Sequence, residues 1–134
     1  MIPRPRATAA AAVAALLTLV PAATAHAQAP GPAQAHGEIF LTVSDSARTW
    51  SRGVLLICPD RSGHHPRAAE ACADLDRAGG ELRQLSGRER MCTMEYAPVI
   101  ATASGLWQGR QVTWRGTFSN TCALTRNTGA VFDF

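Results

Sequence analysis

Residues 109–118 read GRQVTWRGTF, and this stretch carries the clearest secondary-structure signal in the chain. The apolar residues Val112, Trp114 and Phe118 alternate there with polar residues. Because successive side chains of a strand point to opposite faces of a sheet, this period of two predicts a strand with one buried face. Such one-sided burial is typical of antiparallel sheets, so a sheet covered on one face is the expected core of the fold.

Strand patterns continue on both sides of this stretch. Upstream, residues 99–103 and 106–107 flank Ser104-Gly105, a pair that predicts a hairpin turn. Downstream, Val131, Phe132 and Phe134 predict a last strand at the end of the sequence. Nearer the start, residues 38–43 alternate like a strand, and residues 54–57 form a continuous apolar run typical of a well-buried strand.

Helical signals follow the apolar run. A helix is expected to open at Pro66, whose missing N–H is harmless in a first turn, and to stop at Gly79-Gly80. Residues 81–85 predict a further short helical turn. The expected fold class is therefore α+β: an antiparallel sheet of about five strands with one main helix and a short second helix packed on one face.

The first 29 residues have the features of a secretory signal peptide. Two early arginines precede residues 9–20, an apolar run too short to span a bilayer, and Ala25-His26-Ala27 matches a cleavage pattern. We therefore expect residues 1–29 to be removed and residues 30–134 to form one secreted, extracellular domain of roughly 105 residues. No other segment is apolar enough to cross a membrane.

The composition excludes some classes of partner. Without the two arginines of the leader, 11 arginines face 10 acidic residues, so the domain is close to neutral. A domain without a basic stripe is not expected to bind nucleic acid. The membrane is not an expected partner either.

An even number of cysteines in a secreted chain predicts disulfides, here two. Four cysteines permit three pairings, and we favour Cys58–Cys72 with Cys92–Cys122 because each bond closes a moderate loop and the two do not cross. Closing each loop stabilises a chain by roughly 3 kcal/mol. A zinc site is the alternative, but the sequence has no C-x2-C pair, and we expect no metal and no cofactor.

Residues 91–98 read MCTMEYAP and suggest a peptide that a protease binds but does not release. Met94 lies two residues after Cys92, just before a strand-like run. An extended chain here would offer the long side chain of Met94 to the specificity pocket of a protease. A disulfide at Cys92 would hold that chain from behind.

Several other motifs occur together with this segment. They are Cys58-Pro59, Gly63-His64-His65-Pro66, Ala69-Glu70-Ala71-Cys72, Gly105-Leu106-Trp107-Gln108-Gly109, Thr117-Phe118-Ser119-Asn120-Thr121-Cys122 and Val131-Phe132-Asp133-Phe134. With these motifs in this order, the chain from about Val43 to Phe134 resembles the Streptomyces-type subtilisin inhibitors, small secreted proteins that block serine proteases.

The resemblance implies an antiparallel sheet with helices packed on it, a homodimer, and the disulfide pairing favoured above. It places the reactive bond two residues after the third cysteine, between Met94 (P1) and Glu95 (P1′). The loop-supporting asparagine of the family falls on Asn120. The rest of the implied binding loop is Cys92 (P3), Thr93 (P2) and Tyr96 (P2′).

The implied partners are subtilisin-like serine proteases. The unbranched thioether chain of Met94 also suits the apolar pockets of chymotrypsin-like enzymes, but it offers no cation to a trypsin-type pocket. Because some family members restrain metalloproteases, an inhibitor directed mainly at a secreted metalloprotease is an alternative. A disulfide-bonded secreted binding module without a protease target is another.

A small secreted hydrolase is the alternative from a different class. His64 or His65 would have to serve as its base, but neither G-x-S-x-G nor H-E-x-x-H occurs in the sequence. Oxidised cysteines would leave no thiol nucleophile. We therefore expect an inhibitor and not an enzyme, with both histidines in the turn before the helix.

Overall fold

The structure is a computed structural model that describes residues 35–134 except 60–62. These residues belong to one compact unit of the chain, Pro32–Phe134. The predicted signal peptide, residues 1–29, lies outside the described residues.

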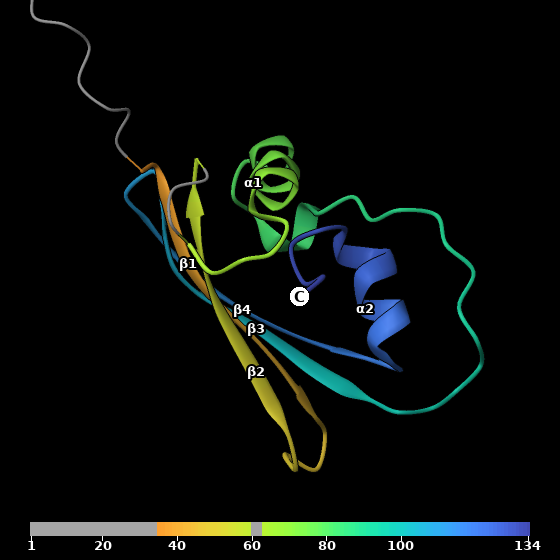
Figure 1. Ribbon diagram of the computed structural model, residues 1–134. Coiled ribbons are helices and arrows are strands. Elements are labelled where there is room, and N and C mark those ends of the chain that lie inside the picture. Colours follow the sequence, from red (N-terminus) through yellow and green to blue (C-terminus); the bar gives the residue numbers. More distant parts are fainter. Residues whose placement is uncertain (1–34, 60–62) are drawn as a thin grey trace, which may run out of the picture. The chain divides into compact units, whose positions relative to one another are not determined.

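Four strands form one antiparallel sheet in the order β2-β1-β3-β4 (Figure 1). They are β1 (Gly37–Asp45), β2 (Ser51–Cys58), β3 (Val99–Trp107) and β4 (Arg110–Phe118). Alternate residues of β1, including Ile39 and Leu41, are fully buried, as a period of two requires. The expected fold class is confirmed, although the described residues contain fewer strands than the sequence predicted.

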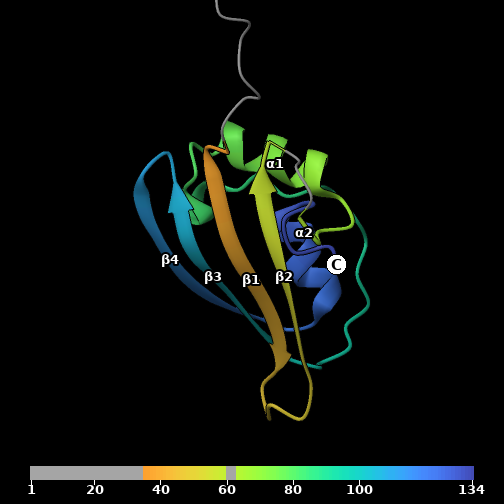
Figure 2. The same ribbon diagram turned by 60° about the vertical axis from the view of Figure 1, so that its left-hand side comes forward.

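The helices lie together on one face of this sheet (Figures 1 and 2). They are α1 (Ala68–Arg77), the 3-10 turn η1 (Leu82–Gln84) and α2 (Thr121–Thr128). The helix predicted between Pro66 and Gly79-Gly80 and the short turn predicted at 81–85 are confirmed as α1 and η1. None of the helices in the described ranges has the length and apolar character needed to cross a membrane.

The turn predicted at Ser104-Gly105 is wrong, because β3 runs straight through these residues. At Gly105 the backbone of β1 comes so close that an added Cβ would lie 2.1 Å from the carbonyl oxygen of Glu38. This glycine therefore marks a close approach inside a strand and not a turn. The β3–β4 turn is Gln108-Gly109, whose positive φ values of 47° and 77° are those of a type I′ hairpin.

The last strand predicted at residues 131–134 is also wrong. This segment follows α2 as a turn, with Val131 and Phe132 buried beneath the sheet. The ring of Phe132 lies 5.4 Å from that of Trp114 on β4. The apolar character that suggested a strand reflects burial alone.

The two disulfides join Cys58 to Cys72 and Cys92 to Cys122, which confirms the favoured pairing. In the first bond, the Cα atoms are 5.5 Å apart and both cysteines are buried. It fixes α1 to the end of β2 and so helps to hold the helical layer on the sheet.

Candidate functional site

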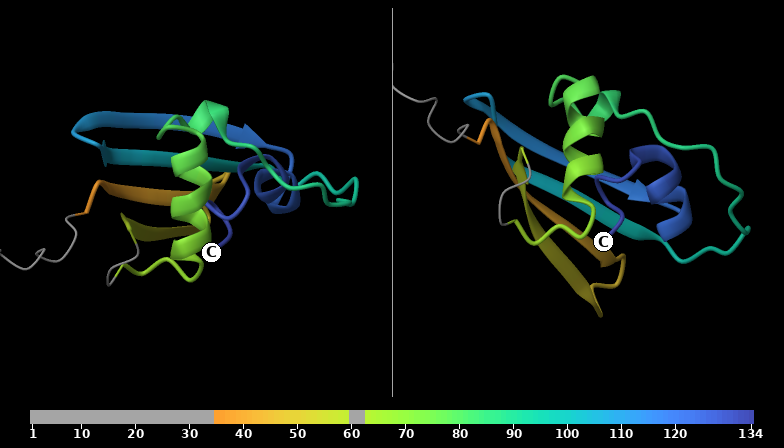
Figure 3. Two further views of the ribbon diagram at one scale, coloured as in Figure 1. Left: turned by 90° about the horizontal axis from the view of Figure 1, so that it is seen from above. Right: turned by 45° about the horizontal axis from the view of Figure 1, so that its top comes forward.

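The long segment between η1 and β3, residues 85–98, has no regular secondary structure and is called the exposed loop below. It passes around the outside of α2 before it enters β3 (Figures 1 and 3). The side chains of Met91, Met94 and Tyr96 on this loop are 100%, 99% and 81% exposed. Large apolar side chains this exposed on a small domain indicate a surface for a binding partner.

A disulfide anchors the exposed loop two residues before Met94. Cys92 is bonded to Cys122 in the first turn of α2, with 5.7 Å between their Cα atoms. The backbone position of the chain just before Met94 is therefore fixed covalently to a helix.

Asn120 links the loop to the start of α2. Its Oδ1 accepts a hydrogen bond from the backbone N–H of Ala123 at 2.8 Å, which caps the helix. Its Nδ2 donates to the carbonyl oxygen of Glu95 at 2.7 Å and lies 3.5 Å from that of Thr93. One buried amide thus holds the residues on both sides of Met94.

The chain after Glu95 is fixed by backbone hydrogen bonds. The N–H of Ala97 donates to the carbonyl oxygen of Ser119 at 2.9 Å. The carbonyl oxygen of Pro98 accepts from the N–H of Ser46 in the β1–β2 turn at 3.1 Å. From Val99 onward the chain is paired in β3. Both sides of Met94 are therefore anchored, while its side chain touches solvent.

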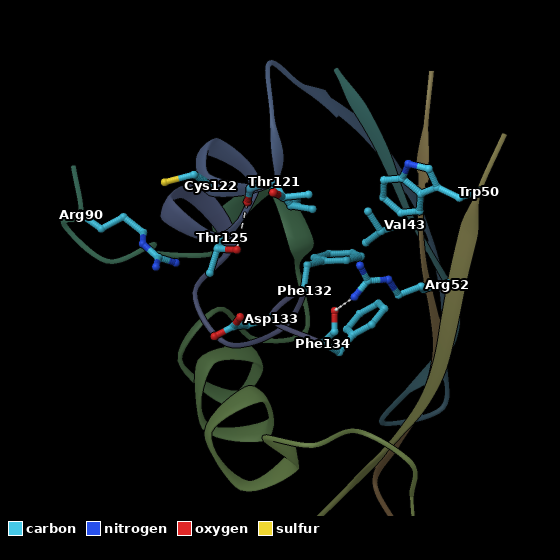
Figure 4. Close-up of a pocket in the computed structure, with 11 residues that line it drawn as sticks. Val43, Trp50, Arg52, Arg90, Thr121, Cys122, Thr125, Phe132, Asp133 and Phe134 are labelled. Carbon is cyan, nitrogen blue, oxygen red and sulfur yellow. Dashed lines mark hydrogen bonds between the residues drawn. The ribbon is translucent and has the colours of Figure 1, made fainter. Parts of the chain in front are cut away.

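A cavity of about 330 Å³ lies behind the loop, between α2, the β1–β2 end of the sheet and the last residues of the chain (Figure 4). The Arg52 guanidinium contacts the ring of Trp50, at 5.6 Å from its centroid, and donates to the carbonyl oxygen of Phe134 at 3.5 Å. Met94 and Glu95 do not line this cavity. The side chain of Met94 therefore projects from the exposed loop into solvent, outside this cavity.

His65 has a structural position. It is 5% exposed, its Nε2 donates to the carbonyl oxygen of Val131 at 2.9 Å, and its Nδ1 accepts from the N–H of Arg67 at 3.0 Å. Both ring nitrogens of neutral His65 therefore form hydrogen bonds with the backbone. His64, in contrast, is exposed. Across residues 35–59 and 63–134, no three His, Cys, Asp or Glu side chains are grouped as a metal site would need.

Comparison with known proteins gives matches over the same region. The family described as subtilisin inhibitor-like matches residues 35–120, which include the whole exposed loop and Asn120. Subtilisin inhibitor-like protein 2 of Streptomyces rochei is 45% identical over 93 residues, covering 68% of this chain and 82% of that protein. The subtilisin inhibitor of Streptomyces albogriseolus is 44% identical over 94 residues, covering 69% of this chain and 65% of that protein.

A solved structure shares the fold. It is the crystal structure of Streptomyces caespitosus sermetstatin in complex with Bacillus licheniformis subtilisin. The TM-score is 0.56 at 33% sequence identity, and the match covers 72% of this chain and 97% of that chain.

Proposed function

The chain belongs to the subtilisin inhibitor-like family, and on this premise we propose that it inhibits subtilisin-like serine endopeptidases. Residues 92–96 would bind in the protease active site as a substrate that is cleaved slowly and held tightly. The observation that carries this proposal is the geometry around Met94: a fully exposed side chain between a disulfide and a buried asparagine that holds its neighbours.

In this proposal Met94 fills the S1 pocket, and its carbonyl carbon faces the catalytic serine. Attack by the serine hydroxyl would form an acyl-enzyme at Met94 and free the amine of Glu95. In an ordinary substrate that amine diffuses away. Here the carbonyl oxygen of Glu95 accepts a hydrogen bond from Asn120, and the N–H of Ala97 donates one to Ser119. The amine of Glu95 therefore stays beside the acyl-enzyme ester of Met94 and can re-form the peptide bond.

Preorganisation accounts for tight binding. A flexible peptide loses roughly 0.5–1.5 kcal/mol for each mobile side chain that it orders on binding. The exposed loop has already lost part of that freedom through its disulfide and the bonds of Asn120. Protease–inhibitor interfaces bury about 1,600 Å² in total and include some of the tightest known complexes.

We also propose that the protein is secreted, with residues 1–29 as its signal peptide. The leader pattern supports this, and so does the presence of two disulfides with no free cysteine among the described residues. An extracellular inhibitor would meet secreted proteases directly.

A homodimer through the outer face of the sheet is a further part of the proposal. This face, opposite the helices, presents Phe40 and Leu106, which are 48% and 51% exposed, on the neighbouring strands β1 and β3. We expect the wild type to sediment as a dimer and Phe40→Asp to shift it toward monomer while leaving inhibition intact. A wild type that sediments as a monomer at micromolar concentrations would exclude the dimer without affecting the inhibitor proposal.

The function is tested by titrating a fixed amount of active subtilisin with the purified protein and analysing the complex by mass spectrometry. We expect stoichiometric loss of activity, with slow cleavage only at Met94–Glu95. Rapid degradation, or no inhibition with both disulfides intact, would contradict the proposal. The same titration with a secreted zinc metalloprotease then separates the alternative target class from a binding module without a protease target.

A further inference from the structure

We infer that residues 86–88, called the stem below, form a clamp that positions the part of the exposed loop before the reactive bond. Gly87 and Arg88 are its positioning residues. This inference rests on the proposed function, because the clamp acts by keeping Met94 in place. Neither residue touches the reactive bond, so their effect on it is indirect.

Gly87 packs directly on the backbone of α2. A Cβ added at Gly87 would lie 1.6 Å from the carbonyl oxygen of Arg126 and 2.8 Å from the Cα of Asn127. These are backbone atoms of a helix and cannot swing aside as the end of a side chain can. The stem therefore lies in this position only because residue 87 has no side chain.

Arg88 ties the stem to the other helix. Its Nη2 lies 2.8 Å from Oε2 of Glu70 in α1, and Glu70 also pairs with Arg67. Hydrogen bonds from Arg88 and Arg67 lower the pKa of Glu70, so its carboxylate is charged at neutral pH. The stem is thus held on one side by the backbone of α2 and on the other by an ion pair to α1.

The clamp and the disulfide act on the same helix. Cys122, which holds Cys92, and Arg126, which meets Gly87, are four residues apart on α2 and therefore about one turn apart. With both contacts made, the chain from Gly87 to Cys92 is fixed at its two ends. With the stem released, the segment before the reactive bond is held only by the disulfide at Cys92 and the 3.5 Å contact between Asn120 and Thr93, so it can move more freely.

This difference matters once the reactive bond is cut. Re-formation of the bond needs the acyl carbon of Met94 to stay within reach of the amine of Glu95, which Asn120 holds. If the stem moves, the two ends separate more often and water competes better for the acyl-enzyme. Loosening the clamp should therefore turn stable inhibition into temporary inhibition, with little effect on the stability of the domain.

The test compares Arg88→Gln with a matched control, Arg110→Gln. Arg110 pairs with Glu81 at 3.3 Å, and both side chains, 60% and 59% exposed, resemble Arg88 and Glu70 at 52% and 48%. We expect Arg88→Gln to speed the cleavage of Met94–Glu95 in the subtilisin complex by about two- to fivefold. The effect is small because a partly exposed ion pair contributes little free energy. Arg110→Gln, which also removes a hydrogen bond of 2.8 Å to the carbonyl oxygen of Gly79, should leave that rate unchanged.

Gly87→Ala should act more strongly, because it displaces the stem backbone. We expect this variant to inhibit subtilisin at least roughly tenfold more weakly than the wild type does. Protease activity should also recover faster from its complex. Equal cleavage rates for Arg88→Gln and Arg110→Gln would overturn the clamp while leaving the proposed function intact.

A second measurement keeps the clamp testable if the wild type does not inhibit subtilisin, a result that would reject the proposed function itself. Amide hydrogen exchange on the free protein reports the mobility of residues 88–93 directly. Faster exchange there in Arg88→Gln than in Arg110→Gln supports the clamp. Equal exchange in the two variants contradicts it.

Discussion

At the scale of single residues, the specificity of inhibition should depend on the side chain at position 94. Met94 is 99% exposed, so the free protein loses almost no contacts when this side chain is replaced. We expect Met94→Lys to strengthen inhibition of trypsin at least about 100-fold, because the new ammonium can pair with the acid at the base of the trypsin pocket. Inhibition constants for trypsin and subtilisin, measured on the same preparations, check this.

Met91→Lys is the matched control for that substitution. Met91 is 100% exposed on the same loop and lies three residues before Met94. If Met91→Lys produced the same gain against trypsin, the assignment of Met94 as P1 would be wrong. The gain would then come from an added positive charge near the protease and not from its specificity pocket.

The residues of the candidate site differ in how far the sequence reveals them. Cys92 and Met94 lie in one short motif, and the pairing of Cys92 with Cys122, favoured among three possible pairings, is confirmed. Gly87 and Arg88 escape sequence reasoning because their partners, Arg126 and Glu70, are distant in the chain. Only packing brings them together.

At the scale of secondary-structure elements, Asn120 connects α2 to the exposed loop. The Oδ1 of Asn120 caps the helix and its Nδ2 donates a hydrogen bond to the loop, so Asn120→Asp and Asn120→Ala separate these two roles. Asp keeps an oxygen for the cap but loses the donor to Glu95, whereas Ala loses both. We expect Asn120→Asp to keep the cap of α2 and to be cleaved faster by subtilisin, because a carboxylate oxygen then faces the carbonyl oxygen of Glu95.

Asn120→Ala should in addition lose about 0.5–2 kcal/mol of stability, the usual cost of removing a helix cap. Denaturant unfolding and the rate of reactive-bond cleavage together distinguish the two variants. Wild-type cleavage rates in both would show that the bond from Asn120 to Glu95 does not support the loop.

The sequence predicts well those elements in which the spacing of apolar residues matches the side chains that the element buries. The alternation in β1 and β4 is local and strong, and so are Pro66 and Gly79-Gly80, which bound the segment that contains α1. The short, threonine-rich helix α2 was not predicted, since its sequence, TCALTRNT, has a weak apolar stripe. Asn120 before it and Gly129 after it are the start and stop signals that could have revealed it.

At the scale of the whole domain, His65 connects segments that are distant in the chain and makes stability depend on pH. Its Nε2 joins the turn before α1 to the carbonyl oxygen of Val131 in the segment after α2. Its Nδ1 can accept the hydrogen bond from the N–H of Arg67 only while the ring is neutral. Burial lowers the pKa of His65 below its ordinary 6.5, an effect that Arg67 adds to and that Val131 and Asp133 oppose. The unfolded chain therefore takes up this proton at a higher pH than the folded protein does.

It follows that the free energy of unfolding falls as pH drops below about 6.5 and levels off below the lowered pKa of the folded state. We expect thermal denaturation to show a lower melting temperature at pH 5 than at pH 7. His65→Gln should melt lower at pH 7 but lose most of this pH dependence. His64→Gln, which changes the exposed neighbour, should retain it, and an equally steep fall in His65→Gln would assign the proton uptake to another group.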